Sequence, residues 1–314
     1  KKKISLSLKL IDNPNINRKK IINQKTTYLF NGLIVLINIS FYLLFEIINE
    51  ITLFQNLLIL FIINIFYIVG YFDDLKNLTA ISKTTLIYII IFFLLIIDKN
   101  FLITELRFKN LMNKIISLDK FSIPITIFFI YIFYNFLNFS DGVNGIAIGL
   151  SIFFILVLIY ERQNYMNLEI VILYTLIMCL IINLKNISFL GNSGVSVLGV
   201  IIPLLYIRDY NLNNSILCDE IFIIFFIPGI DMTRLVIERI IKKKSIAKAD
   251  LNHLHHLILT KYNKDKCFVI YILLSITPYL ISKLLNDYKL AISLSLIFYF
   301  IIIIFFKKER IKSF

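Results

Sequence analysis

The sequence predicts an all-α, polytopic integral membrane protein, and composition and the spacing of apolar runs are the observations that predict it. Hydrophobic residues make up 59% of the 314 residues and charged residues 17%, which is too few charges for the surface of a soluble protein of this size. A spanning helix needs roughly 20 apolar residues. About ten runs approach that length, at residues 29–48, 52–72, 84–97, 123–138, 145–160, 167–184, 195–208, 216–240, 266–283 and 287–306.

The chain is interpreted as one transmembrane domain over residues 1–314, because no repeat or soluble segment interrupts the apolar runs. It opens at Lys1 with the stretch KKKISLSLKLIDNPNINRKK, which contains no apolar run of the kind found in signal peptides. We therefore expect one more N-terminal helix in the full protein. The three cysteines have no paired spacing that would suggest zinc or a disulfide framework, and we expect them to be packing residues.

The formal net charge of +13 is interpreted as a topology signal and not as a nucleic-acid footprint, because the basic residues occur in the breaks between apolar runs. Alternating the sides of the spans puts the N-terminal segment, the C-terminus and the breaks near 73–83, 139–144, 185–194 and 241–265 on one face. This face carries most of the Lys and Arg residues, so it is expected to be cytoplasmic. The polar motifs described next all fall on it.

Asp73 and Asp74 are adjacent acids at the end of a long apolar run, in GYFDDLKNL. A solvated helix end would explain them. Ionisable groups close to hydrocarbon are costly and often functional, however, and two neighbouring carboxylates repel unless a cation shares them. A hard divalent metal is therefore the functional interpretation of this pair.

Two short polar turns precede later apolar runs. NFSDGVNG contains Asp141 with Asn138 and Asn144 nearby, and FLGNSG contains Asn192. Taken alone, a plain Asx turn is the simpler interpretation of the first. The free N–H groups of a helix N-terminus also favour anions, so both turns are candidates for contact with a nucleotide or a metal-bound diphosphate.

All three histidines of the chain, His253, His255 and His256, lie in one basic loop with the sequence ADLNHLHH. A cationic loop on a membrane face is explained by attraction to lipid headgroups. Histidine can in addition bind metal or hydrogen-bond phosphate. The spacing does not fit a helical pair of zinc ligands four residues apart, so phosphate contact is the preferred role over zinc.

The order of these pieces resembles the polyprenyl-phosphate N-acetylhexosaminyl-1-phosphate transferases, of the glycosyltransferase family 4 type. LIDNPNINRKK resembles the opening segment of that family, and IPGIDMTRLVIERIIKKKSIAKADLNHLHHLI (227–258) resembles its late cytoplasmic stretch, in the branch that uses UDP-N-acetylhexosamines. Members usually have about eleven spans. The resemblance implies transfer of N-acetylhexosamine-1-phosphate from a UDP-sugar to undecaprenyl phosphate on the cytoplasmic face of the bacterial inner membrane, with release of UMP. A homodimer is left open.

The resemblance also implies roles for residues. The candidate catalytic acids are Asp73, Asp74 and Asp141. Substrate contacts would come from Lys83, Asn138, Asn144, Asn183, His253, His255 and His256. The cofactor would be Mg²⁺, with Mn²⁺ as a substitute, held by Asp73, Asp74, Asp141 and Asn192. Phosphoryl transfer asks mainly for positioning and charge neutralisation.

The chain departs from the family pattern at several positions. Asn192 stands where the glycine turn usually has an Asp, Asn144 stands where the Asp-Gly turn usually has a second Asp, and Leu251 stands where an Arg is common. An Asn carbonyl can still bind Mg²⁺, but each exchange removes a negative charge, so metal affinity is expected to fall.

Two rivals to an active transferase follow. One is an impaired homologue that binds the lipid or the nucleotide sugar without turnover, suggested by Asn144 and Asn192. The other is a transporter, because ionisable residues near membrane helices often mark ion paths. Transporter sites usually lie near mid-span, whereas these polar residues gather in breaks on one face. A CDP-alcohol phosphotransferase is disfavoured because SDGVNGIAIGLS lacks the Arg-containing Asp pattern of that family.

Overall fold

The computed structural model describes residues 11–12, 27–28, 30–49, 53–76, 78–109, 115–162, 167–212, 215–243 and 252–312. The N-terminal motif LIDNPNINRKK, apart from Ile11 and Asp12, and Leu251 lie outside these residues. The helices are α2 (Phe30–Ile48), α3 (Leu53–Lys76), α4 (Ala80–Ile97), α5 (Ser122–Ser140), α6 (Ile146–Arg162), α7 (Asn167–Leu184), α8 (Gly191–Leu212), α9 (Cys218–Ile224), α10 (Phe226–Ile241), α11 (Leu254–Leu259), α12 (Lys264–Leu285) and α13 (Tyr288–Lys312). Short 3₁₀ helices η1 (Lys99–Phe101) and η2 (Asp119–Phe121) flank a small hairpin of β3 (Glu105–Arg107) and β4 (Ile115–Ser117), and β1 (Ile11–Asp12) pairs antiparallel with β2 (Thr27–Tyr28).

The prediction of an all-α polytopic membrane protein is confirmed, with a correction to the spans. Within the described residues, 8 helices are long and apolar enough to cross a membrane, compared with about ten expected. The run 145–160 forms α6, which is shorter, at 17 residues. The run 216–240 is not one span, because its helix breaks at Phe225 between α9 and α10. Pro228 lies just after this break and lacks the N–H that a continuous helix would need.

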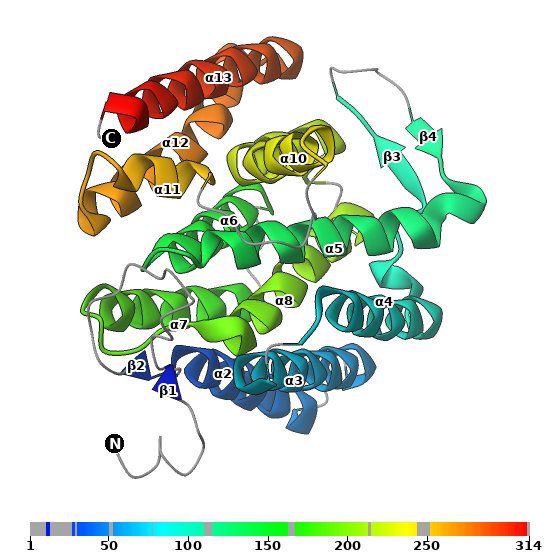
Figure 1. The fold of residues 1–314 in the computed structure, drawn as a ribbon. Coiled ribbons are helices and arrows are strands. Elements are labelled where there is room, and N and C mark those ends of the chain that lie inside the picture. The colour runs from blue at the N-terminus through cyan, green and yellow to red at the C-terminus, as the bar shows by residue number, and fades with distance from the viewer. Residues whose placement is uncertain are drawn as a thin grey trace.

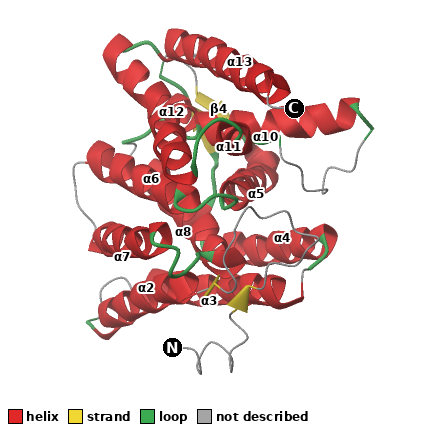
Figure 2. Ribbon diagram, turned by 60° about the vertical axis from the view of Figure 1, so that its left-hand side comes forward, coloured by secondary structure: helices red, strands yellow, loops and turns green. Residues whose placement is uncertain are grey.

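Helix α8 forms the centre of the bundle. Nearly all its residues from Gly191 to Tyr210 are buried, whereas the other spanning helices bury only one stripe and expose the rest. Figures 1 and 2 show α8 between α5 and α6 on one side and α2, α3 and α7 on the other. A helix that is apolar all round is expected at a core position. The polar turn that begins α8 is therefore surrounded by the ends of several other helices.

The polar breaks lie at one end of this bundle. Near the start of α5, Thr126 Oγ1 accepts from the Ile103 amide, and near the end of α8, Asn211 Nδ2 donates to the Leu102 carbonyl. The start of α5 and the end of α8 are thus neighbours. The two helices pack along their length, with the Tyr134 hydroxyl 2.9 Å from Ser196 Oγ near the other end. They run antiparallel, so the end of α5 and the start of α8 share one end of the bundle.

Buried ion pairs join α6, α7 and α8 at the opposite end. Arg162 Nη1 lies 3.1 Å from Glu169 Oε1 and Arg162 Nε lies 3.3 Å from Asp209 Oδ1. Arg208 Nη2 lies 3.6 Å from the same Glu169 oxygen. Charges buried this deeply have to be paired, because desolvating them alone is costly. This network holds the far ends of the helices that carry the candidate site.

Candidate active site

Asp74 joins the end of α3 to the start of α8. Its Oδ1 accepts from the Asn192 amide at 3.0 Å and its Oδ2 accepts from the Ser193 amide at 3.0 Å. These are N–H groups of the first helical turn, which have no partner inside the helix. The carboxylate therefore satisfies both donors and favours the positive end of the α8 dipole. The acid of the first motif and the GNSG turn form one unit.

Two glycines make this approach of α3 and α2 to α8 possible. A Cβ on Gly70 would lie 2.4 Å from the Asn192 carbonyl oxygen and 2.6 Å from the Ser193 Cα. A Cβ on Gly32 would lie 2.6 Å from the Gly194 amide nitrogen. Both clashes are with backbone atoms, which cannot rotate away. The start of α8 is held between α2 and α3 by direct backbone packing.

Asp73 faces a different partner from its neighbour. Its Oδ2 lies 2.8 Å from Lys83 Nζ, and its Oδ1 accepts from the Leu78 amide at 2.9 Å. The Lys83 ammonium also lies over the Tyr134 ring, 5.2 Å from its centroid. The acidic pair is therefore split, with Asp73 neutralised by Lys83 and Asp74 bound to α8. This separates the like charges that the sequence places side by side.

The Asp141 turn contacts the histidine loop. Asp141 is the C-cap of α5, and the next residue, Gly142, faces His255 so closely that a Cβ there would lie 2.7 Å from Nε2. The same Cβ would lie 3.5 Å from His256 Cε1. The second and fourth motifs thus meet, although more than a hundred residues separate them in the chain. Both are at the end of α5 where the start of α8 also lies.

His255 is buried without a hydrogen-bond partner. It is 1% exposed, and neither Nδ1 nor Nε2 has such a partner among the described residues. Burial lowers the pKa of His255 well below its usual value, and the neighbouring histidines lower it further, so the ring is neutral. A neutral imidazole has one donor and one acceptor, and buried polar groups almost always find partners. These two atoms are therefore candidates for contact with a bound ligand.

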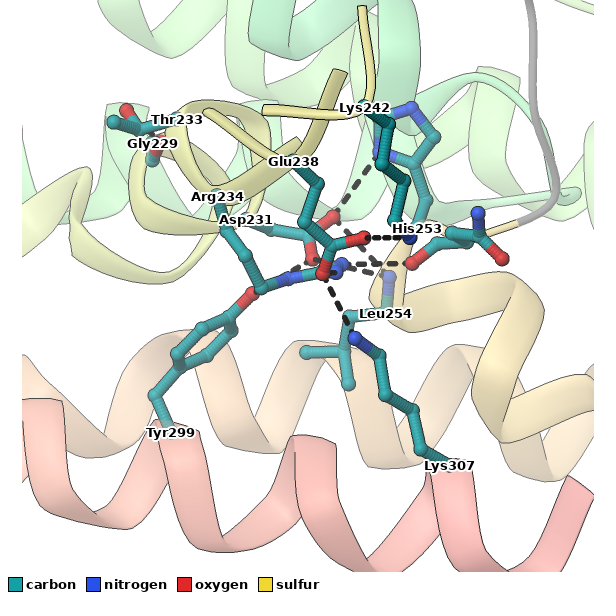
Figure 3. A network of polar contacts seen from close by, with 11 residues as sticks. Gly229, Asp231, Thr233, Arg234, Glu238, Lys242, His253, Leu254, Tyr299 and Lys307 are labelled. Carbon is teal, nitrogen blue, oxygen red and sulfur yellow. Dashed lines mark hydrogen bonds and ion pairs between the residues drawn. The ribbon is translucent and has the colours of Figure 1, made fainter. Parts of the chain in front are cut away.

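His253 has a different setting (Figure 3). Its Nδ1 lies 3.1 Å from Asp231 Oδ2, and its ring stacks on that of His255 with centroids 5.4 Å apart. The Asp231 carboxylate also accepts from the Leu254 amide, which begins α11. Sequence reasoning gave Asp231 no role. The sequence feature that could have identified Asp231 is that it is an acid inside an apolar run, three residues before Arg234.

Two asparagines that are expected to contact substrate make hydrogen bonds to the segment between α7 and α8. Asn183 is 2% exposed, and its Nδ2 donates to the Ser188 carbonyl at 3.1 Å. Asn144 donates through Nδ2 to Asn186 Oδ1, which links the α5–α6 turn to the α7–α8 turn. These contacts support a positioning function for both side chains. Substrate contact by Asn183, Asn144 and Asn138 stays a prediction.

The described residues contain no group of three or more His, Cys, Asp or Glu side chains that could hold a metal ion. Asp74 uses both oxygens for backbone donors, and Asp73 is paired with Lys83. Mg²⁺ is nevertheless commonly held by one or two carboxylates together with substrate phosphates. The oxygen donors at this end fit a metal that arrives with a diphosphate, and they do not form a closed cage for a free ion.

Comparisons with known proteins show what the chain is similar to. Residues 56–209 match the family model described as glycosyl transferase family 4. Over these residues, just under half of the chain, the sequence is similar to that family. A Bacillus subtilis (strain 168) protein described as a probable undecaprenyl-phosphate N-acetylglucosaminyl 1-phosphate transferase is 29% identical over 189 residues. That alignment covers 58% of this chain and 52% of the relative, so the chain spans about half the length of the relative it matches.

The family match confirms the resemblance inferred from the motifs. It includes the acidic pair, Lys83, the Asp141 turn and the GNSG turn, and it ends before Asp231 and the histidine loop. The loop is connected to the matched region by its contact with Gly142. The roles of the individual site residues stay predictions.

The contact between Gly142 and His255 leads to a first testable prediction. We expect Gly142→Ala to lower the rate of transfer by about 10- to 100-fold, because a misplacement of about 1 Å at a reacting centre has effects of this size. Gly142 itself is exposed and has no positive φ that would require glycine. The melting temperature should therefore stay near that of the wild type. Full activity of the variant would show that this contact is not used.

Proposed function

We propose that the protein transfers N-acetylhexosamine-1-phosphate from a UDP-sugar to undecaprenyl phosphate. The observation that carries the proposal is the buried His255, whose ring nitrogens have no hydrogen-bond partner among the described residues and whose Nε2 faces the Asp141–Gly142 turn. The family and the relative support a transferase of this class. The N-acetylhexosamine and the polyprenyl acceptor are the finer parts of the proposal.

In the proposed reaction a phosphate oxygen of the lipid attacks the β-phosphorus of the UDP-sugar. The bond from that phosphorus to the oxygen bridging the two phosphates breaks, and UMP leaves with the electron pair. Lys83 would neutralise the lipid phosphate, from its position beside Asp73. The imidazoles of His253 and His255 would hydrogen-bond the diphosphate, a role suited to a neutral or charged ring.

The metal would be Mg²⁺, with Mn²⁺ as a substitute. When bound, it would neutralise charge that develops on the phosphate oxygens. The carboxylate of Asp141 and the side-chain carbonyl oxygen of Asn192 are the protein oxygens suited to bind the metal. Asp73 or Asp74 could join them only by giving up its present partners. Asp74 would keep the start of α8 oriented toward the diphosphate, and the other N–H groups of the first turn of α8 would favour this anion.

We expect Mn²⁺ to bind this protein weakly alone and much more tightly when a UDP-N-acetylhexosamine is present. Asn192→Asp adds a carboxylate and should lower the Kd of Mn²⁺ by about tenfold, equivalent to about 1.4 kcal/mol. Titration followed by electron paramagnetic resonance of Mn²⁺ measures both effects. An unchanged Kd in the variant would place the side chain of residue 192 outside the coordination sphere.

The site would face the cytoplasm of a bacterial inner membrane. The face on which its breaks lie, together with the N-terminal segment and the C-terminus, carries most of the Lys and Arg residues of the chain, which short cytoplasmic segments retain. A transporter is disfavoured because the polar groups meet at one end of the bundle, whereas transporter sites usually lie near mid-span.

Release of UMP tests the function. Purified protein in detergent, with Mg²⁺, undecaprenyl phosphate and UDP-GlcNAc or UDP-GalNAc, should form UMP and a lipid-linked sugar diphosphate in equal amounts. UMP without lipid-linked product would indicate hydrolysis. No UMP from any UDP-N-acetylhexosamine, with Mg²⁺ or Mn²⁺, would favour the impaired homologue suggested by Asn144 and Asn192.

A further inference from the structure

A buried polar network lies beside the candidate site, and its members other than His253 have no part in the reaction described above. Its centre is Asp231 on α10, which is 2% exposed. Figure 3 shows its carboxylate between α10, α11 and α13. It accepts hydrogen bonds from four groups, namely His253 Nδ1 (3.1 Å), the Leu254 amide (3.2 Å), Arg234 Nη2 (2.9 Å) and the Tyr299 hydroxyl (2.9 Å).

The contact with His253 determines which ring nitrogen carries the proton. A carboxylate only accepts, so Nδ1 must be protonated to bond with it. The second nitrogen, Nε2, is then the atom left for a ligand. The Leu254 amide bonds to the same carboxylate and so fixes the first turn of α11, which carries His255 and His256.

The rest of the network holds Asp231 itself in place. Arg234 donates to Asp231, to the Tyr299 hydroxyl through Nε, and to the Asn252 carbonyl at 2.7 Å. It also pairs with Glu238 at 2.8 Å, and Lys307 from α13 lies 2.8 Å from the same oxygen. Asn252 directly precedes His253. Three consecutive residues, Asn252, His253 and Leu254, are thus hydrogen-bonded to α10.

We propose that Asp231 is a positioning residue that holds His253 as the Nδ1–H tautomer, with Nε2 directed to the diphosphate of the donor. This inference rests on the proposed function for its substrate. The geometry favours it over a purely structural ion pair, because Arg234 alone would neutralise the charge of Asp231 without any contact to the ring. Asp231 contacts the ring and the backbone of the next residue together.

The tautomer can be observed directly, because the chain has only 3 histidines. Protein labelled with ¹⁵N-histidine, in nanodiscs, should give three imidazole spin systems, and His253→Gln assigns one of them. We expect wild-type His253 to carry its proton on Nδ1. A wild-type ring protonated on Nε2 alone would overturn the proposal, and this measurement requires no Asp231 variant to fold.

Asp231→Asn should change the tautomer for a defined reason. Arg234 can only donate, so the amide oxygen of the new side chain is expected to face it. The NH₂ group would then face His253 Nδ1, which must become an acceptor, with the proton moving to Nε2. We expect kcat/KM for UMP formation to fall about 10- to 100-fold, the usual effect of losing a carboxylate that orients a functional histidine. Asp231→Glu should recover part of this loss.

Glu238→Gln is the matched control. It removes the negative charge that Arg234 and Lys307 share in the same network, but the hydrogen bonds of Glu238 are to these two residues and not to His253. We expect an unchanged His253 tautomer and a change in kcat/KM of less than about threefold, as for a partly exposed ion pair.

Two results would overturn the positioning role. One is an equal loss of activity in Asp231→Asn and Glu238→Gln with the same His253 tautomer in both. The other is a changed tautomer in Asp231→Asn with wild-type kcat/KM. If wild-type protein forms no UMP at all, the proposed function fails, whereas the spectra still decide whether Asp231 sets the protonation of His253.

Discussion

Asp74→Ala is expected to abolish transfer, with a loss of UMP formation of at least about 100-fold, as when a group that orients charge at a reacting centre is removed. The substitution leaves the Asn192 and Ser193 amides without their acceptor, so the first turn of α8 loses these two hydrogen bonds to α3. It also removes an acid from the end where Lys83 and the proposed phosphates meet. Asp141→Ala is expected to give a similar loss.

Loss of a helix cap alone has a smaller effect, and Asp98→Ala provides the comparison. Asp98 is a buried acid whose Oδ1 accepts from the Asn100 amide at the start of η1, at the opposite end of the bundle. Its removal should cost about 1 kcal/mol of stability and leave transfer intact. Melting temperature and UMP release should be measured for both variants. Wild-type activity in both Asp74→Ala and Asp141→Ala would contradict the site assigned here.

Gly70→Ala is expected to disturb the same junction by packing alone, without changing any charge. The added methyl group would lie 2.4 Å from the Asn192 carbonyl oxygen and 2.6 Å from Ser196 Oγ. Helix α3 or the start of α8 has to move, at a cost of about 1–3 kcal/mol for overpacking. Because that movement separates Asp74 from the α8 amides, transfer should fall together with the melting temperature.

Gly229→Ala is the control for this substitution. Gly229 lies in α10, and a Cβ there would meet nothing within 4 Å. Alanine should stabilise this helix by about 0.5–1 kcal/mol and leave transfer unchanged. A Gly70→Ala protein with the stability and activity of the wild type would mean that α3 and α8 tolerate a wider separation, and that the close contact of Gly70 is not required.

The motifs could be read from the sequence because each is local. Asp73 and Asp74 end one apolar run, and Asp141 and the GNSG turn stand between others, so alternation of sides puts them at one end. The same reasoning failed for the run 216–240, where apolar composition hides a break at Phe225. Hydropathy measures how apolar a segment is, and it does not detect a single missing backbone hydrogen bond near Pro228.

The sequence by itself determined the fold class, the resemblance to a family and the end of the bundle at which the polar breaks gather, because segment length and apolar composition decide which residues cross a bilayer. Only the tertiary structure decided which residues of the site contact one another. It separates Asp73 from Asp74, bonds Asp74 to residues 118 and 119 positions away, turns Gly142 against His255 and gives Asp231 its contact with His253. These pairings depend on the rotation and depth of packed helices, which arise from contacts between distant segments and leave no periodic pattern in any one of them.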